Sequence, residues 1–268
     1  MRLSLLKLVP FAQRAVDRAL MQTTANAREY YPKDRIRPIS VLKVRILLAL
    51  GANPNVCSNY LSSGTYKKGL PLLYAAIYDL PSIAKMLLRH GAFVEVEEDG
   101  ETPLRLACKK PEILEALLDA GADIDAVNYR KETALMKASY AILDQNDQTP
   151  VRAVQVLLDH GANVNLRDLH GQTPLMRMFG GGTKGPAYQV ASLLVAKSDL
   201  EIKDDYGQTA LMLAAQWGSY WMVEEMIAKG VKLDSKDRDG KTAYYYAQNT
   251  NSDDPGVKAK LLKLLLPR

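Results

Sequence analysis

A phrase of five residues recurs along this chain at nearly even spacing: Gly-Ala, then Asn or Asp, then any residue, then Asn or Asp again. Complete copies lie at residues 51–55, 121–125 and 161–165, and weaker copies lie at 91–95, 197–201 and 230–234. Five intervals separate Gly51 from Gly230, so the mean period is about 36 residues. Such a period is typical of chains built from small stacked units. We therefore expect the function to lie on an extended surface rather than in one buried active site.

A second phrase, Thr-Pro-Leu or Thr-Ala-Leu, accompanies the first. Its copies begin at Leu70, Thr102, Thr133, Thr173, Thr209 and Thr242, with Leu in place of Thr in the first copy. A Thr hydroxyl can accept hydrogen bonds from the free N–H groups of a helix start, and Pro suits the first helical turn. Small residues and an apolar run with helical spacing follow, and Gly then supplies the left-handed residue that ends a helix. Each unit is thus predicted to contain a turn, a short helix, a loop, a longer helix and a polar turn.

Together the two phrases resemble the ankyrin-repeat family, whose units read Asp-x-x-Gly-x-Thr-Pro-Leu-His-x-Ala-Ala and later Gly-Ala-Asp-Val-Asn. Residues 205–215 carry the first part as Asp-Tyr-Gly-Gln-Thr-Ala-Leu-Met-Leu-Ala-Ala. The resemblance covers residues 39–266 and implies an all-α solenoid of stacked helix-turn-helix units with short β-hairpin-like fingers. It implies about six to seven repeats, the first and last acting as caps, behind an N-terminal capping segment at residues 1–38.

The ends of the array are predicted to be closed by helices, because a terminal repeat would otherwise expose its apolar face. Residues 11–29 are expected to form the N-terminal cap helix, with one apolar face made of Ala12, Ala15, Val16, Ala19 and Leu20. Residues 257–266 are expected to form the C-terminal cap helix. In that helix the lysines 258, 260 and 263 should face solvent, and the leucines 261, 262, 264 and 265 should pack inward.

The histidine that follows Thr-Pro-Leu in the family is absent from every copy here. Its positions hold Leu73, Arg105, Met136, Met176, Met212 and Tyr245. In the family this histidine braces the turn by hydrogen bonds, so Met and Leu imply apolar packing instead. The histidines that the chain does have lie elsewhere: His90 and His160 precede helix-ending glycines, where a polar tip suits a helix C-terminus, and His170 lies at a finger tip. No carboxylate or cysteine lies at ligand spacing from them, so we expect no metal site and no cofactor.

Two adjacent units are longer than the others. From the Thr position to the Gly position, two units span 21 residues, one spans 19, and the long units span 28 and 24. The extra residues lie at 140–150 and at 180–185, in both cases between the two predicted helices of a unit. Neighbouring insertions can mark a binding face, although loop length also drifts at little energetic cost. Both interpretations stay open at the level of the sequence.

Partners of ankyrin-repeat proteins usually contact the finger tips and the exposed side of the first helix of each unit. Aromatic, basic and polar residues at these positions are the predicted partner-binding set: Tyr78, Lys109, Lys110, Tyr129, Arg130, Tyr140, His170, Tyr206, Gln216, Trp217 and Arg238. Tyr, Trp and Arg are the residue types most often found as interface hot spots. We therefore predict a protein-interaction module that binds, masks or inhibits a partner protein through its concave groove. An inhibitor or immunity-type protein acting on a specific enzyme is the sharper alternative.

Charge distribution leaves a different class of partner open. The net charge is +5, yet residues 1–50 hold ten Lys or Arg against three Asp or Glu, so this segment alone carries +7. Binding of nucleic acid or of an anionic membrane through the N-terminal segment is therefore an alternative, although a capping helix often carries solvated basic residues.

Enzymatic classes find no support in the sequence. The glycines at 180–185 lack the Gly-Lys-Ser/Thr of a phosphate-binding loop and follow a helix, and no nucleophile, base and acid occur in a recognisable arrangement. Two cysteines form no disulfide framework, which favours a reducing, cytoplasmic compartment. Secretion or periplasmic export stays open, because the apolar start resembles a signal peptide, although Lys7 interrupts it.

Overall fold

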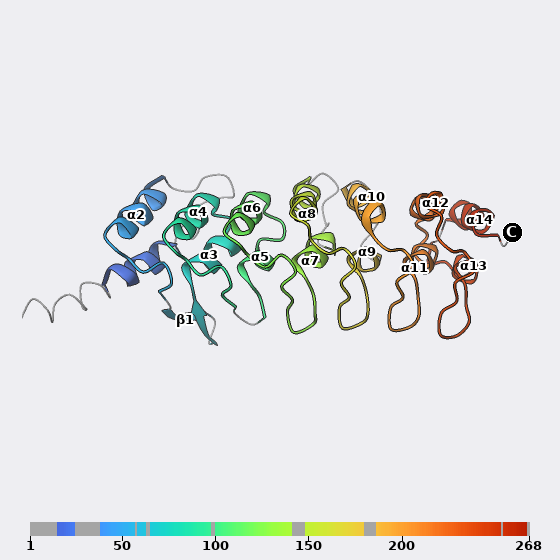
Figure 1. Ribbon diagram of the computed structural model, residues 1–268, viewed down its shortest axis with the longest axis horizontal. Helices are drawn as coiled ribbons and strands as arrows, with labels where there is room; N and C mark the ends of the chain where they lie inside the picture. Colours follow the sequence, from blue (N-terminus) through green and yellow to red (C-terminus); the bar gives the residue numbers. More distant parts are fainter. Residues whose placement is uncertain are drawn as a thin grey trace, which may run out of the picture. The chain divides into compact units, whose positions relative to one another are not determined.

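The computed structural model describes residues 15–24, 38–56, 58–62, 65–97, 100–140, 148–179, 186–252 and 254–266. The chain divides into two compact units, unit 1 at Met1–Asp123 and unit 2 at Ile124–Arg268. Each unit is a stack of helix pairs, in which a short first helix is followed by a second helix packed beside it (Figure 1). The predicted solenoid of helix-turn-helix repeats is therefore confirmed.

Unit 1 begins with a helix over residues 15–24 and ends with the pair α5 and α6. Its named helices are α2 (Pro38–Ala49), α3 (Pro71–Ile77), α4 (Pro81–Arg89), α5 (Pro103–Leu106) and α6 (Pro111–Asp119). The second helices α2, α4 and α6 pack in a row, and α3 packs on α5. Before α3, strands β1 (Ser58–Ser62) and β2 (Thr65–Gly69) form an antiparallel hairpin. The predicted hairpin-like finger is a true two-stranded hairpin at this position.

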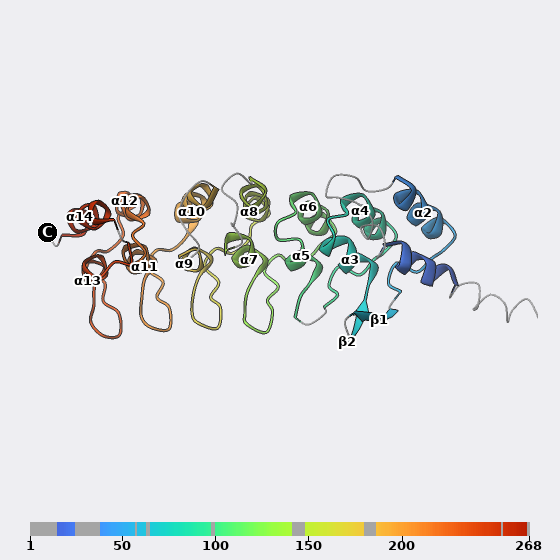
Figure 2. The ribbon, with the colours of Figure 1, turned by 180° about the vertical axis from the view of Figure 1, so that it is seen from behind.

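In the described part of unit 2 the helices form four pairs. They are α7 (Ala134–Tyr140) with α8 (Thr149–Asp159), α9 (Pro174–Arg177) with α10 (Pro186–Lys197), α11 (Ala210–Gln216) with α12 (Tyr220–Ala228), and α13 (Ala243–Gln248) with α14 (Pro255–Leu264). The first helices pack on one another in chain order, and so do the second helices. A finger precedes each first helix, at residues 126–133, 166–173, 202–209 and 235–242, and these fingers project to one side of the unit (Figures 1 and 2).

The two sequence phrases produce the helix boundaries by local chemistry. Thr102, Thr133, Thr173 and Thr209 each accept a hydrogen bond from the backbone N–H three residues on. Thr242 precedes α13 but makes no such bond, so the predicted cap is wrong at that copy. At the C-terminal end of the second helix, the glycine of the five-residue phrase has a left-handed backbone in every repeat whose phrase begins with glycine, with φ between 81° and 88°. A residue with a Cβ is disfavoured there, which explains why the phrase keeps Gly.

A ladder of hydrogen bonds joins consecutive copies of the five-residue phrase. In each rung the side chain at the fifth position accepts a hydrogen bond from the backbone N–H at the third position of the next copy. Two rungs lie in unit 1, from Asn55 to Phe93 at 2.6 Å and from Glu95 to Asp123 at 2.7 Å. Three rungs lie in unit 2: Asp125 to Asn163, Asn165 to Asp199, and Glu201 to Lys232, at 3.0, 2.9 and 2.8 Å. The polar end of the phrase therefore couples each repeat to its neighbour.

The positions that lack the family's histidine are mostly part of the core, as predicted. Leu73, Met136, Met176 and Met212 are buried among the first helices. Arg105 is also buried, and it pairs with Glu101 at 3.2 Å rather than packing as an apolar residue. Tyr245 is the exception, because its ring is exposed beside Tyr246. His90 and His160 each direct Nδ1 to the carbonyl oxygen four residues earlier, in keeping with their predicted place at a helix C-terminus.

The predicted terminal helices are present where the chain is described. In the helix at residues 15–24, Leu20 is buried but Ala15 is exposed, so the predicted apolar face is wrong at Ala15; Ala12 lies outside the described residues. Leu261 and Leu265 are buried in and just after α14, while its lysines 258, 260 and 263 are exposed. The two insertions lie between the helices of a pair, as predicted, but most of their residues fall outside the described part. Across the described residues, none of the helices is both long enough and apolar enough to cross a membrane.

Candidate functional site

A cleft of about 530 Å³ opens in unit 2 where the first helices meet the fingers. It is lined by Arg130, Glu132, Tyr140, Asp168, Leu169, His170, Gln172, Met176, Arg177, Phe179, Leu213 and Trp217. Four of the predicted partner-binding residues belong to this lining: Arg130, Tyr140, His170 and Trp217. We call this feature the cleft. The structure therefore brings together residues that are up to 87 positions apart in the sequence.

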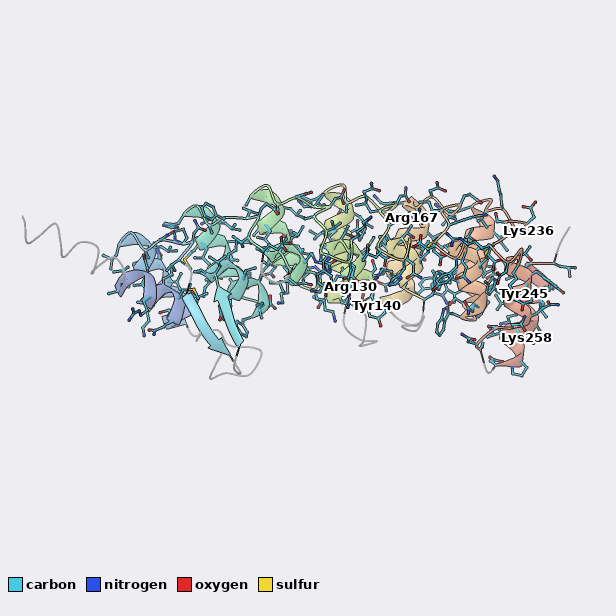
Figure 3. The ribbon with its side chains drawn as sticks, turned by 90° about the horizontal axis from the view of Figure 1, so that it is seen from below. Arg130, Tyr140, Arg167, Lys236, Tyr245 and Lys258 are labelled. Atoms are coloured by element: carbon cyan, nitrogen blue, oxygen red, sulfur yellow. The ribbon has the colours of Figure 1, made fainter. Side chains whose placement is uncertain are left out.

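Two aromatic side chains contribute exposed apolar surface to the cleft. Tyr140 is the last residue of α7 and is 56% exposed, and Trp217 follows the end of α11 and is 45% exposed. Small residues precede both rings, Ala138 and Ser139 before Tyr140 and Ala214 and Ala215 before Trp217, so the first helices pack closely there and the large rings lie at the helix ends. Figure 3 shows Tyr140 beside Arg130 on the finger side of α7. Exposed aromatic rings of this kind supply large contact areas at low entropic cost.

The finger tips next to the cleft are held in register by backbone hydrogen bonds. The N–H groups of Leu169, Asp205 and Arg238 donate to carbonyl oxygens of the preceding finger, at 3.0 to 3.1 Å. Tyr129 and Tyr206 project from these tips and are exposed, and the Arg130 guanidinium lies over the Tyr129 ring at 5.6 Å. The predicted residues Tyr129, Tyr206 and Arg238 therefore lie along one connected row of fingers.

A charged network that the sequence interpretation missed forms one wall of the cleft. Arg177 of α9 donates to Asp168 of its own finger at 2.6 Å and to Glu132 of the preceding finger at 2.9 Å. Its guanidinium also lies over the Tyr140 ring at 6.0 Å. The sequence pattern that indicates this network is the pair of offsets from the capping threonine: Arg177 lies four residues after Thr173, and Asp168 lies five residues before Thr173. Comparison of these offsets between repeats would have identified the network.

The last repeat builds the same network with a different donor. Tyr246, four residues after Thr242, donates its hydroxyl to Asp237 at 2.6 Å and accepts from Gln208 of the preceding finger at 2.6 Å. Partial burial raises the pKa of Asp237, but hydrogen bonds from Tyr246 and from the N–H groups of Lys241 and Asp239 outweigh it and lower the pKa below its usual value. Burial and the hydrogen bond to Asp237 raise the pKa of Tyr246.

Removal of this hydroxyl gives a pH-dependent prediction. Tyr246→Phe is expected to lower the free energy of unfolding by about 1 kcal/mol near pH 7, because two hydrogen bonds are lost. The contribution of Asp237 is present above its unfolded pKa of about 3.9 and is lost as the pH falls through its lower folded value. The contribution of Tyr246 is present below about pH 10 and is lost as the pH rises through its higher folded value.

The difference in the free energy of unfolding between Tyr246→Phe and the wild type should therefore be largest between about pH 4 and pH 10, and it should become smaller below and above this range. Urea denaturation at a series of pH values measures it. Tyr245→Phe is the matched control, since Tyr245 is the exposed neighbour on the same helix. A difference that is independent of pH, or one that Tyr245→Phe reproduces, would contradict the assigned network.

The remaining predicted residues have other surroundings. In unit 1, Tyr78 follows α3 and stacks on Tyr74 at 5.8 Å, and Lys109 is half-buried in the turn before α6. The Lys110 ammonium donates to the carbonyl oxygens of Ala76 and Ile77, so it ties two repeats together rather than pointing freely into a groove. In unit 2 the backbone carbonyl of Gln216 accepts hydrogen bonds from Thr250 and Asn251 of the next repeat. Lys110 therefore has a structural role, and the contact of these residues with a partner stays a prediction.

Trp221 does not belong to the cleft. It lies at the start of α12, in the row of second helices, and its ring packs against Tyr188 of α10 with 4.4 Å between centroids. The contact with Tyr188 accounts for an aromatic residue at this position.

Comparison with known proteins agrees with the repeat architecture. A model described as "Ankyrin repeats (3 copies)" matches residues 41–128 and 183–266, and an "Ankyrin repeat" model matches residues 130–169. The human B-cell lymphoma 3 protein is 36% identical over 114 residues, which is 40% of this chain and 24% of that protein. The human SH3 and multiple ankyrin repeat domains protein 2 is 30% identical over 159 residues, 58% of this chain and 8% of that protein. The chain thus spans well under half of the length of these curated relatives.

Solved structures show the same fold at lower identity. The ankyrin repeat domain of Bcl-3 has a TM-score of 0.70 at 22% identity and covers 93% of this chain and 98% of that structure. The ankyrin repeat domain of human ASB11 has a TM-score of 0.66 at 20% identity, with the same coverage of 93% and 98%. Because the matching family models cover most of the sequence, and the helix pairs, capped fingers and left-handed glycines follow their pattern, the chain belongs to the ankyrin-repeat family.

Proposed function

We propose that this chain is a protein-interaction module whose unit 2 binds a segment of a partner protein in the cleft and along the adjacent finger tips. The observation that carries the proposal is the convergence of Tyr140 and Trp217, both about half-exposed, in one concave feature of unit 2. Large apolar side chains left open in a concave surface favour association, because covering them removes apolar area from water. The similar proteins described above are ankyrin-repeat proteins, and none of them identifies a partner for this chain.

In this proposal the chain has no chemistry of its own and acts by holding, masking or inhibiting its partner. An inhibitor of a specific enzyme is the narrower form, in which the finger tips cover the partner's active site. The observations of unit 2 favour a protein partner over nucleic acid, since the lining of the cleft is aromatic and carries both signs of charge.

Truncation of one ring tests the cleft directly. Partners captured from an extract of the source cells are identified by mass spectrometry, and the purified partner is then titrated against the purified chain. Trp217→Ala is expected to weaken binding about 30-fold, because the loss of a central aromatic costs about 2 kcal/mol. Tyr188→Ala is the matched control, since Tyr188 is 47% exposed but lies on α10 outside the lining of the cleft.

A spectroscopic readout distinguishes direct contact from loss of fold. The chain holds two tryptophans, so Trp221→Phe leaves Trp217 as the single reporter and Trp217→Phe leaves Trp221. Partner binding should shield the fluorescence of Trp217 from acrylamide quenching and should leave the quenching of Trp221 unchanged. Equal affinity of the wild type and Trp217→Ala for every captured partner, or shielding of Trp221 alone, would exclude the cleft as the binding surface.

A further inference from the structure

The carboxylate of Asp204 differs from its equivalents in the neighbouring repeats. Asp204 is 4% exposed, and within the described part of the chain its Oδ2 atom has no hydrogen-bond partner. The equivalent Oδ2 atoms of Asp168 and Asp237 each accept a hydrogen bond at 2.6 Å. We propose that a partner supplies the missing donor as an arginine side chain, which enters the cleft and pairs with Asp204. The inference rests on the proposed function, because it names the chemistry of the segment that the cleft binds.

The three carboxylates are oriented in the same way by the same backbone bonds. Oδ1 of Asp204 accepts from the N–H groups of Tyr206 and Gln208, at 2.9 and 2.8 Å. Oδ1 of Asp168 and Oδ1 of Asp237 accept from the N–H groups at the corresponding two positions of their own fingers, also at 2.8 to 2.9 Å. Fixing Oδ1 fixes the direction of Oδ2, so the Oδ2 atom of Asp204 points where Arg177 and Tyr246 deliver their donors in the other repeats.

The residue that should supply the donor in this repeat cannot do so. The position four residues after the capping threonine holds Arg177 and Tyr246 in the neighbours but Leu213 here, and leucine has no polar atom. Leu213 lines the cleft, and so does Gln172, which occupies the finger position that Glu132 and Gln208 hold in the other networks. Glu132 accepts a hydrogen bond at this position and Gln208 donates one, and the amide of Gln172 can do either. The finger side chain of the network is therefore retained, and only the central donor is missing. A buried carboxylate without a donor is costly, which favours a ligand that supplies one.

Arg177 shows what kind of group fits this place. Its guanidinium donates to two acceptors at once, Asp168 and Glu132, and lies over the ring of Tyr140. At the neighbouring place, the proposed acceptors are Asp204, which is buried just outside the set of lining residues, and Gln172, which belongs to that set. Trp217 follows Leu213 by one helical turn and also lines the cleft. An incoming guanidinium can therefore donate to a carboxylate and an amide oxygen and stack on an indole, which is the preferred surface for a cation among aromatic side chains.

The balance of charge favours a cation as well. Among the residues that line the cleft, Arg130 and Arg177 balance Glu132 and Asp168. Asp204 adds one negative charge that no residue of the network compensates, because Gln172 is neutral. A basic segment of the partner thus complements the cleft, whereas an acidic segment would add a second uncompensated carboxylate.

The chain itself supplies a conservative variant for the test. Asn128 occupies the position of Asp204 in the first finger of unit 2, and its Oδ1 accepts the same two backbone hydrogen bonds, from Arg130 and Glu132 at 2.8 and 2.9 Å. Asp204→Asn should therefore keep the finger intact and remove only the charge and the acceptor at Oδ2. Leu213→Arg is the complementary variant, because it places a guanidinium at the position of Arg177 and should fill the site from within.

The experiment selects ligands for the full chain from a phage-displayed library of random dodecapeptides. Peptides that require Trp217 are kept, and each arginine in them is replaced by citrulline, which has nearly the same shape but no charge. We expect the selected peptides to contain one arginine that pairs with Asp204. Replacing this arginine by citrulline should weaken binding to the wild type about tenfold, but should weaken binding to Asp204→Asn by less than about twofold. Leu213→Arg should bind the same peptides at least about tenfold more weakly. Asp239→Asn, which removes an exposed carboxylate outside the cleft, should behave as the wild type.

The outcomes separate the two proposals. Two results would overturn the pairing with Asp204 and leave the cleft as a binding site. In the first, the peptides that require Trp217 lack arginine. In the second, citrulline substitution weakens the binding affinity equally for the wild type and for Asp204→Asn. If no selected peptide requires Trp217, the cleft itself is contradicted and the pairing falls with it. Weaker binding that Asp239→Asn reproduces would show a general charge effect and would also overturn the inference.

Discussion

Arg177→Met is expected to lower the free energy of unfolding by about 3 kcal/mol, because it removes the cation between two carboxylates. The Asp168 side chain is 1% exposed and that of Glu132 is 16% exposed, so water cannot replace the lost hydrogen bonds. The Arg177 side chain is itself 21% exposed, which puts the expected loss at the lower end of the range for buried ion pairs. Methionine keeps an unbranched apolar stem in place of that of arginine, so the measured change reports mainly on the loss of the guanidinium.

Urea denaturation followed by circular dichroism measures this loss. Adding Asp168→Asn to Arg177→Met should recover at least half of it, because the uncompensated charge is removed while Asn keeps the finger's backbone bonds, as Asn128 does. The neighbouring repeat tolerates Leu213 at the same place because its second acceptor is the neutral Gln172, whereas Arg177→Met leaves two carboxylates facing each other. Stability within about 0.5 kcal/mol of the wild type would show that the network contributes little.

Gly207→Ala should also cost about 3 kcal/mol, for a reason that depends on the next repeat. Gly207 has a φ of 79°, which costs a residue with a Cβ about 1 kcal/mol. An added Cβ would lie 2.8 Å from the backbone nitrogen of Arg238 and 3.2 Å from its Cγ. That nitrogen donates to the carbonyl oxygen of Tyr206, so relief of the clash would break a hydrogen bond between two fingers. The clash and the broken bond add about 2 kcal/mol to the strain.

Gly240→Ala separates the two contributions. Gly240 has the same place in the last finger and a φ of 78°, but a Cβ there would meet no atom within 4 Å. It should therefore cost only the conformational strain of about 1 kcal/mol. The comparison of both variants by urea denaturation isolates the contact between fingers. Equal losses would mean that neighbouring fingers do not pack tightly enough to transmit the clash.

Helix boundaries and the repeat pattern could be predicted because each boundary is set by residues close together in the sequence. Thr209 caps α11 through the N–H of Met212, and Gly230 ends the next helix by its own positive φ. Neither effect needs information from distant residues. Tyr140 and Trp217 could be identified for the same reason, since each closely follows a pair of small residues at the end of a first helix, where a large ring extends outward.

The charged networks were harder to predict from the sequence, because each of them joins a first helix to two fingers. Arg177 and Glu132 are 45 positions apart, and only the fixed offsets within the repeats connect them. Lys110 was selected as a groove residue for its charge, but whether its ammonium points outward or caps α3 depends on the carbonyl groups of the previous repeat. The missing donor at Leu213 becomes visible only once Asp204 is seen to keep the orientation of its equivalents.

The ladder of hydrogen bonds between the five-residue phrases has a consequence for how this chain can change in length. The donor and acceptor of a rung are separated by 28 residues at one step and by 38 at another, yet the distance between the two atoms stays between 2.6 and 3.0 Å. Residues can therefore be gained or lost within a repeat without altering the spacing of its neighbours. A change in the length of one repeat would thus leave intact the frame on which the cleft is built.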